Sequence, residues 1–296
     1  MQAISTKQLR YFHALSRLKH FGKAADHCAV TQPALSMQIK DLEHILGLSL
    51  VVRGKSKITL TPDGEEIAQR AEKILADIQD IGDYARTRGG VLAGTFRLGV
   101  IPTIAPYILP KILPALGKDF PDLDLKLKET TTPHLSDALL QGQLDAILVA
   151  LPIHHAELMT KELFSDPFFL VINSESSNQT TDPMKLLEEN NLLLLEEGHC
   201  LRDQAISLCE NVSQKSLSQF GATSLKTLIE LVANNQGITL VPKLAAKVEI
   251  PQDSPLRLIP FAPPEPVRTI GLVWRKSSPR IKDFSALANT ITNAIK

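Results

Sequence analysis

Residues 24–47 read AADHCAVTQPALSMQIKDLEHILG, and this stretch decides the fold of the N-terminal part of the chain. Its opening pair of alanines suits a short, closely packed helix. Thr31 is then a candidate N-cap, and Pro33 is tolerated in the first turn of the next helix. Apolar residues follow at positions 35, 39, 42 and 46, which is helical spacing, and Gly47 is a typical stop signal. Two helices joined by so tight a turn predict a helix-turn-helix.

The segments on either side of this stretch extend it to a winged helix-turn-helix. Upstream, Leu9, Phe12 and Leu15 form an apolar helical stripe. Downstream, LVVRGKSKITLTPDG places two short β-prone runs around a basic tip, which predicts a hairpin wing. The candidate DNA contacts are the outward residues of the second helix and the basic residues of the wing: Thr31, Gln32, Pro33, Ser36, Met37, Lys40, Arg53, Lys55 and Lys57.

The charge of the chain is divided unevenly between this module and the rest. The 296 residues include 32 basic and 32 acidic ones, so the formal net charge is zero. Residues 1–61, however, contain nine Lys or Arg and only three Asp or Glu. This excess favours a polyanionic partner such as nucleic acid, although a basic surface without a partner would give the same count.

A heptad repeat follows the wing. Its apolar positions step alternately by four and three residues: Ile67, Ala71, Ile74, Ile78, Ile81 and Ala85. Thr61 can cap the helix, with Pro62 as its first residue. The narrow seam between charged flanks favours a dimerising linker helix, and the alternative is a helix packed on its own domain. Residues 86–94, RTRGGVLAG, then indicate a hinge.

Strands and helices alternate from residue 95 onward, which predicts parallel sheet with crossover helices. The helix expected within residues 104–121 should break near its prolines. We expect a winged helix-turn-helix over 1–61, a linker helix and hinge over 62–91, and an α/β regulatory domain over 92–296. Subdomain I of that domain takes about 92–164 and 269–296, and subdomain II takes about 165–268. A ligand cleft is expected between them, at the strand ends.

Several blocks of the sequence resemble LysR-type transcriptional regulators, over essentially the whole length of the chain. Residues 24–47 are similar to the recognition unit of that family. Within the family, GHCLRDQA, IPTIAPYILP, ATSLKTL, GITLVP and EPVRTIGLVWR resemble the OxyR-type peroxide sensors. The resemblance implies a regulatory domain of two Rossmann-like subdomains, similar to periplasmic binding proteins. It also implies a cytoplasmic transcription regulator that is dimeric or tetrameric, and not an enzyme.

The same resemblance assigns peroxide sensing to Cys200 and the role of resolving cysteine to Cys209. The reactive species is a thiolate, and three features are candidates to stabilise it: a helix N-terminus just after Gly198, the adjacent His199, and Arg202. Oxidation would give a sulfenic acid that the second cysteine captures as a disulfide. The alternative is that both cysteines are inert members of the core, as we expect for the third cysteine, at position 28.

The family pattern also implies a set of side chains that hold hydrogen peroxide. These are Thr103, Thr132, His199 and Arg268. A hydroxyl both donates and accepts hydrogen bonds, which suits a ligand that does the same. Pro133 departs from the expected pattern and puts the loop geometry beside Thr132 in doubt.

Helix geometry limits how the two cysteines of the 200–209 segment can meet. On one continuous helix their positions are separated by roughly 13.5 Å along the axis. A disulfide needs Cα atoms within about 7 Å of each other. We therefore expect oxidation to unwind or refold this segment, which would supply a two-state switch.

Three other classes of protein remain as alternatives. The strongest is a LysR-type regulator that binds a small organic effector in the cleft and makes no use of its cysteines. A thiol peroxidase leaves the basic module and the heptad repeat unexplained, and a solute-binding protein leaves residues 1–90 unexplained. We see no export signal, membrane span or zinc-like Cys/His spacing, and we expect no metal or cofactor. The expected partners are promoter DNA, hydrogen peroxide, further copies of the chain, RNA polymerase, and a thiol reductant such as glutaredoxin or thioredoxin.

Overall fold

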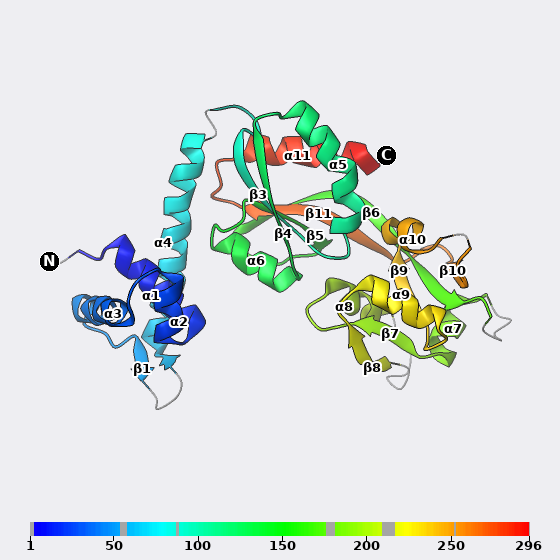
Figure 1. Ribbon diagram of the computed structural model, residues 1–296, viewed down its shortest axis with the longest axis horizontal. Helices are drawn as coiled ribbons and strands as arrows, with labels where there is room; N and C mark the ends of the chain where they lie inside the picture. The colour runs from blue at the N-terminus through cyan, green and yellow to red at the C-terminus, as the bar shows by residue number, and fades with distance from the viewer. Residues whose placement is uncertain are drawn as a thin grey trace. The chain divides into compact units, whose positions relative to one another are not determined.

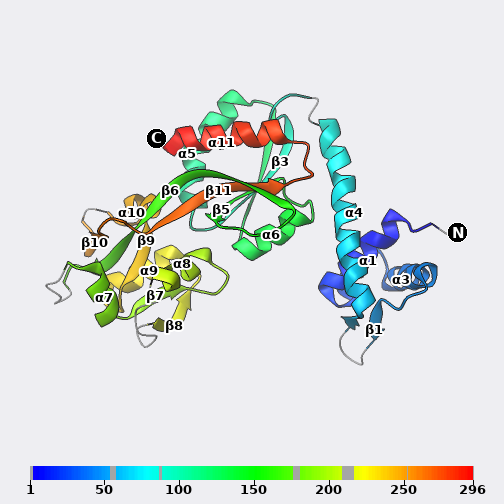
Figure 2. The same cartoon turned by 180° about the vertical axis from the view of Figure 1, so that it is seen from behind.

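A computed structural model describes residues 3–53, 58–86, 89–175, 181–208, 217–251 and 253–295. The chain divides into two compact units, residues 1–85 and residues 86–296, with residues 140–142 grouped with the first. Helices dominate the first unit, whereas the second combines sheets with flanking helices (Figures 1 and 2). Among the expected site residues, Lys55, Lys57 and Cys209 lie outside the described residues, as does the side chain of Arg53.

The first unit has three short helices and a hairpin: α1 (Thr6–Leu18), α2 (Phe21–His27), α3 (Gln32–Leu46), β1 (Val51–Arg53) and β2 (Ile58–Leu60). The two strands pair antiparallel, as expected for a wing. Phe12, Leu35 and Ile39 are fully buried in the core that the helices share. Thr31 occupies the predicted N-cap position of α3, but its side chain makes no capping hydrogen bond. That side chain is exposed.

The helix α4 (Pro62–Arg86) begins where the sequence places it, because Thr61 Oγ1 accepts a hydrogen bond of 2.9 Å from the Gly64 N–H. The seam changes character along its length. Ala71 is buried, whereas Ile74, Ile78 and Ile81 are 45%, 41% and 70% exposed. The second half of the seam is therefore apolar and uncovered by its own chain, as a helix that pairs with a partner requires.

The second unit is built on a seven-stranded sheet. Its strands are β3 (Gly94–Val100), β4 (Leu123–Glu129), β5 (Ala146–Leu151), β6 (Leu158–Asn173), β9 (Thr239–Pro242), β10 (Leu256–Pro260) and β11 (Val267–Arg275). They run in the order β10-β6-β11-β5-β3-β4, with β9 also paired to β6. Strand β3 is parallel to β4 and β5, as the alternation of elements predicts.

The sheet is mixed rather than purely parallel, because β6 and β11 pair antiparallel with each other and with their other neighbours. Strand β6 is 16 residues long, so its first half pairs with β11 and its second half reaches β9 and β10. Long strands that continue from one half of the sheet into the other explain why the alternation of elements alone did not reveal this arrangement.

Helices cover both halves of the sheet. Figure 1 shows α5 (Ala105–Asp119) and α11 (Ile281–Ile295) on one side of the first half, and α6 (Thr132–Leu140) on the other. The second half carries α7 (Pro183–Glu189), α8 (Cys200–Leu208), α9 (Leu225–Ala233) and α10 (Lys243–Glu249). It also holds a small parallel pair, β7 (Leu192–Leu195) and β8 (Leu217–Ala222).

The expected break in α5 is wrong, since the helix is continuous through two internal prolines. Pro106, Pro110 and Pro114 are all exposed, and their spacing of four residues places them on one face of the helix. A proline leaves a backbone carbonyl without its N–H partner. On an exposed face water can satisfy that carbonyl, so the helix bears the prolines while its opposite face stays buried.

Candidate functional site

A cavity of about 140 Å³ lies in the second unit, beyond the ends of β3, β4 and β7. Thr103 and Tyr107 line it from the loop after β3 and the start of α5. His199 lines it from the loop before α8, and the first turn of α9 closes it with Ser224 and Lys226. Two residues that the family pattern assigns to peroxide, Thr103 and His199, therefore line one cavity.

Cys200 is the first residue of α8 and directly follows His199. Gly198 adopts the left-handed region with φ 89°, which lets the chain turn into the helix where other residues would be strained. The cysteine is a free thiol and is only partly exposed. Its position at the helix N-terminus agrees with the sequence expectation.

Burial raises the pKa of the Cys200 thiol above its ordinary value. Several groups oppose that rise: the positive charge of Arg268, the Thr132 side chain, and backbone hydrogen bonds at Ala150 and Leu201. The reduced protein thus holds a protonated thiol beside several groups that favour its anion.

Arg268 stands at the centre of the polar groups and is only 1% exposed. Its Nε and Nη2 donate to Asp166 Oδ2 at 3.0 and 2.9 Å, which is a buried ion pair. Its Nη1 donates to Thr103 Oγ1 at 2.9 Å, and Nη2 also donates to the Thr103 carbonyl at 3.1 Å. These bonds fix the guanidinium and make the Thr103 hydroxyl an acceptor.

Both threonine hydroxyls keep hydrogen-bonding capacity to spare. Because Thr103 Oγ1 accepts from Arg268, its own hydrogen remains for another acceptor. Thr132 Oγ1 is buried and has no nitrogen or oxygen partner within the described part of the chain. The thiol of Cys200 is the group with which it interacts. A buried hydroxyl without a full set of partners is rare and needs an explanation, such as a small polar ligand.

The other two expected residues near the thiol behave differently from each other. Burial lowers the pKa of His199, and the nearby Glu196 carboxylate opposes this only in part. The imidazole is therefore neutral at neutral pH. Arg202 donates from Nη1 to the Leu195 carbonyl at 2.9 Å, which ties α8 to the end of β7. Among the described residues, Arg268 rather than Arg202 is the cation that lowers the Cys200 pKa.

Three residues of this site were missed by the sequence analysis. Asp166 pairs with Arg268 because the two are directly opposite in the antiparallel register of β6 and β11. Tyr107 donates from its hydroxyl to Glu249 Oε1 at 3.0 Å, and both residues line the cavity. Cross-strand register and a helix-to-helix contact leave no local signal in a sequence, although an acidic residue in a strand opposite an essential arginine would be the feature to seek.

The expected DNA contacts of the helix-turn-helix lie at the N-cap of α3 and along that helix in the first unit. Thr31, Gln32, Pro33, Met37 and Lys40 are exposed, and Ser36 is half-buried. Met37 is 58% exposed, which is unusual for a large apolar side chain and leaves it available to a partner. Cys28 ends α2 and packs against the core of the same unit, and burial raises its pKa.

The described residues include neither a candidate metal site nor a candidate membrane-spanning helix. Among the described residues, no group of three or more His, Cys, Asp or Glu is placed to hold a metal ion. In the same part of the chain, no helix combines the length and the apolar character that crossing a membrane requires.

Comparison with known proteins places the chain in a family. Residues 6–65 match the bacterial regulatory helix-turn-helix protein family of lysR type, and residues 89–296 match the LysR substrate binding domain. The chain belongs to the LysR family. Like other members, it combines a helix-turn-helix module with an α/β regulatory domain.

The LysR-family proteins most similar to this chain include several OxyR proteins. The DNA-binding transcriptional dual regulator OxyR of Escherichia coli is 39% identical over 97% of this chain and 95% of its own. The hydrogen peroxide-inducible genes activator of Haemophilus influenzae is 36% identical, over 99% and 98%. Among solved structures, a full-length OxyR variant from Pseudomonas aeruginosa gives a TM-score of 0.75 at 35% identity, covering 98% of this chain and 95% of that one. The chain is thus an OxyR-like LysR regulator.

Proposed function

We propose that this LysR-family protein senses hydrogen peroxide at Cys200 and converts its oxidation into a change in transcription. The observation that carries the proposal is the surroundings of the thiol. A buried arginine and two threonine hydroxyls with spare hydrogen-bonding capacity gather beside a cysteine at a helix N-terminus. One solved relative, a cysteine-to-serine OxyR variant from Corynebacterium glutamicum, is described as bound to hydrogen peroxide, at 34% identity and a TM-score of 0.67.

The first chemical step forms a sulfenic acid. The Cys200 sulfur attacks one oxygen of hydrogen peroxide, the O–O bond breaks, and the other oxygen leaves as water after taking the thiol proton. Arg268 and the free hydroxyl hydrogen of Thr103 stabilise the charge on the leaving oxygen. Thr132 holds the peroxide with its buried hydroxyl, which has no nitrogen or oxygen partner among the described residues. His199 is neutral and orients the ligand from the cavity wall.

The second step forms a disulfide and moves the helix. The Cys209 thiol loses its proton as its sulfur attacks the sulfenic sulfur, the S–S bond forms, the S–O bond breaks, and the departing hydroxide takes up that proton to leave as water. Helix α8 covers Cys200–Leu208, so its two ends are about 12 Å apart along the axis. A disulfide cannot span that distance. Closing the bridge therefore requires α8 to unwind, and the disulfide then holds the rearranged regulatory domain.

The output is read by the helix-turn-helix module. Exposed residues of α3 enter the major groove of promoter DNA, and the basic wing contacts phosphates. Two chains join through the uncovered seam of α4, and two such dimers form a tetramer. The oxidised protein then acts on RNA polymerase, and a cytosolic dithiol reductant of the glutaredoxin or thioredoxin type reverses the disulfide. The protein is oxidised once per signal and does not turn over peroxide as an enzyme.

A small organic acid as effector is the second candidate function, and the cavity disfavours it. Glu129 and Glu249 line the cavity, against one lysine, Lys226. A carboxylate ligand would meet two like charges there, which is unfavourable. The volume of about 140 Å³ is also small for a drug-sized ligand but ample for peroxide.

The test is transcription in vitro with defined redox forms. DNA fragments selected by the full chain from a random pool serve as templates, with purified bacterial RNA polymerase. Hydrogen peroxide should change transcript yield with the wild-type chain and with Cys28→Ser, but not with Cys200→Ser. An equal response of Cys200→Ser to peroxide would overturn the proposal.

A further inference from the structure

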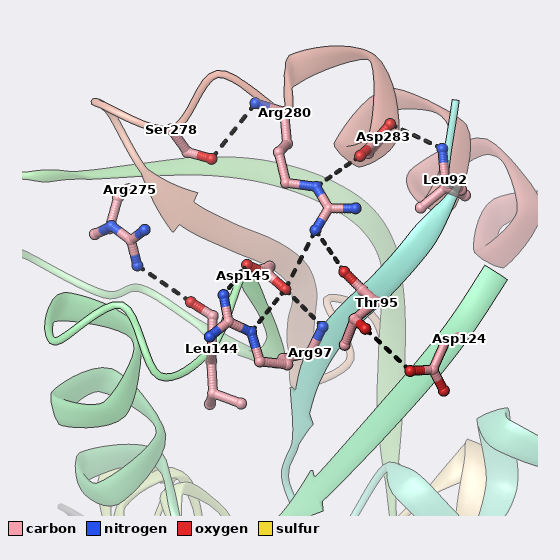
Figure 3. Close-up of polar contacts among 10 residues, drawn as sticks. All are labelled: Leu92, Thr95, Arg97, Asp124, Leu144, Asp145, Arg275, Ser278, Arg280 and Asp283. Atoms are coloured by element: carbon pink, nitrogen blue, oxygen red, sulfur yellow. Dashed lines mark hydrogen bonds and ion pairs between the residues drawn. The ribbon is translucent and has the colours of Figure 1, made fainter. Parts of the chain in front are cut away.

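The residues just after the hinge are tied into a buried polar network in the second unit. Leu92 is 1% exposed and has φ 52°, a left-handed conformation that strains a residue other than glycine. Its backbone N–H donates to Asp283 Oδ1 at 2.9 Å, and Asp283 Oδ2 accepts from Arg280 Nε at 2.7 Å (Figure 3). The strained backbone is thus held by one carboxylate at the start of α11.

The same arginine connects this contact to the start of two strands. Arg280 Nη1 donates to the Thr95 carbonyl in β3 at 2.9 Å and lies 3.5 Å from Asp145 Oδ2, just before β5. Asp145, Arg280 and Asp283 are only 2–3% exposed. We call Leu92, Asp145, Arg280 and Asp283 the hinge clasp. Its charged groups are buried and paired with one another. Breaking one contact would leave a buried charge without its partner, so we expect the contacts to form and break together.

Three strands join the hinge clasp to the surroundings of Cys200. Strand β5 starts next to Asp145, and near its other end the backbone at Ala150 hydrogen-bonds the Cys200 thiol. Strand β3 likewise leads from the clasp to the loop that carries Thr103. Strand β11 carries Arg268 near its start, and at its end Arg275 donates to the Leu144 carbonyl at 3.2 Å, beside Asp145.

We propose that the hinge clasp is the device that passes the oxidation state of Cys200 to the linker helix. The inference rests on the proposed function and adds how its signal leaves the regulatory domain. When α8 unwinds, β5 loses the hydrogen bond between Ala150 and the Cys200 thiol, Arg268 of β11 loses the neighbouring thiol, and these strands shift as stiff units. The shift pulls Asp145 and Arg280 out of register with Asp283. Leu92 then loses its acceptor and relaxes, and the hinge is released.

Space for this release exists beside the clasp. A cavity of about 430 Å³ is lined by Gly90, Val91 and residues 279–283. Gly90 already has φ 123°, a conformation that glycine adopts easily. The hinge residues therefore have both room and backbone freedom to move once the carboxylate lets go of Leu92.

The decisive measurement is amide hydrogen exchange on the full-length wild-type chain, reduced and after one equivalent of hydrogen peroxide. Mass spectrometry of trapped thiols on the same samples reports the Cys200–Cys209 bridge. We expect the peptide that contains Leu92 to exchange at least tenfold faster once the bridge forms. Complete bridging with no change in that peptide would overturn the clasp alone. Absence of the bridge would overturn the proposed function as well.

Variants test the direction of the coupling. Asp283→Asn keeps the size of the side chain but replaces an acceptor facing Arg280 with a donor, so its Leu92 peptide should exchange fast in both redox forms. Its rate of Cys200 oxidation should stay within twofold of wild type, because Asp283 does not line the cavity of about 140 Å³ that Thr103 and His199 line. Asp119→Asn, an exposed carboxylate at the end of α5, is the matched control and should retain the redox difference. Arg280→Lys serves as the second variant if Asp283→Asn does not fold, and a wild-type redox difference in either would contradict the proposal.

Discussion

At the scale of single residues, the chemistry of Cys200 depends on what surrounds it rather than on a preformed thiolate. Burial raises the pKa of the thiol, and Arg268 is the charged group that lowers it. Asp166 fixes the position of that arginine but also neutralises part of its charge. The balance keeps the resting thiol protonated and makes its reactivity sensitive to the exact placement of one guanidinium.

Arg268→Lys tests that placement. Lysine keeps the positive charge but cannot make the fork of hydrogen bonds to Asp166 and Thr103. We expect Cys200 to be oxidised at least about tenfold more slowly, and its pKa to rise further. The pH dependence of Cys200 alkylation in a Cys28→Ser background measures that pKa. Arg202→Lys is the control, and equal slowing in both variants would mean that a general loss of structure is responsible.

Thr132→Val separates a structural from a chemical role of the buried hydroxyl. Removing a buried hydroxyl that has no nitrogen or oxygen partner among the described residues should leave the free energy of unfolding unchanged or raise it by about 1 kcal/mol. Oxidation of Cys200 should nevertheless become several-fold slower. The fluorescence of Trp274, the single tryptophan, follows urea unfolding of the second unit. Thr130→Val should change neither quantity, and wild-type oxidation kinetics in Thr132→Val would remove the threonine from the site.

The residues of the site divide into those that the sequence could predict and those that it could not. Cys200, Thr103, Thr132, His199 and Arg268 follow from motif position, and each of them interacts with another of the five or lines the cavity. Asp166 depends on the register of two strands separated by about a hundred residues. No local pattern encodes that register, because it is set by the packing of the whole sheet.

At the scale of elements, helix boundaries were predicted well where a cap defines them. Thr61 caps α4, and Thr31 occupies the N-cap position of α3. Helix α5 was predicted less well, because the exposure of its prolines follows from tertiary packing and not from their spacing alone. The hinge clasp was not foreseen for the same reason, since its members come from three separate elements.

The contact of α1 with α4 should be sensitive to acid. Burial, with Arg17 and His27 as further causes, lowers the pKa of His13 in α1 to about 4, and Glu72 of α4 is 3.9 Å away. In the unfolded chain the pKa of this histidine is near its ordinary 6.5. The unfolded state therefore binds more protons between these values. The contribution of His13 to the free energy of unfolding is fully present above about pH 6.5. It is lost as the pH drops towards 4, by up to about 3 kcal/mol.

Native-state hydrogen exchange of α1 at pH 7.5 and pH 5 measures this effect. The opening free energy of α1 should be lower at pH 5 in the wild type, and His13→Gln should reduce the difference. His154→Gln, an exposed histidine of the second unit, is the control and should behave like the wild type. A pH dependence that persists unchanged in His13→Gln would assign the acid sensitivity to other groups.

At the scale of the whole molecule, one long helix, α4, follows the helix-turn-helix module and precedes the α/β regulatory domain. The exposed Ile74, Ile78 and Ile81 of that helix are apolar and uncovered by their own chain. The heptad repeat predicts an apolar seam, but only the packing of the described residues shows which side chains of the seam are exposed. Under the proposed function, the charge asymmetry, the helix and the cavity serve one purpose: oxidation of Cys200 in the second unit changes what the first unit does on DNA.

Ile81→Asp should separate the chains. Ile81 is 70% exposed, so the substitution costs the folded monomer little while placing a charge in the dimer seam. Sedimentation velocity should show a loss of at least tenfold in dimer affinity. Gln69→Asp, on the exposed side of the same helix, should leave the assembly unchanged. A wild-type sedimentation profile for Ile81→Asp would contradict the role of the seam.

The central claim is that Cys200 senses peroxide and Cys209 resolves it. Mass spectrometry of trapped thiols after a brief exposure to equimolar hydrogen peroxide tests it most directly, on the wild type and on Cys209→Ser. The wild type should form a Cys200–Cys209 disulfide within seconds, and the variant should accumulate a sulfenic acid at Cys200. If both thiols remain free while peroxide is in excess, the claim is contradicted, and the cavity must be assigned to a different effector.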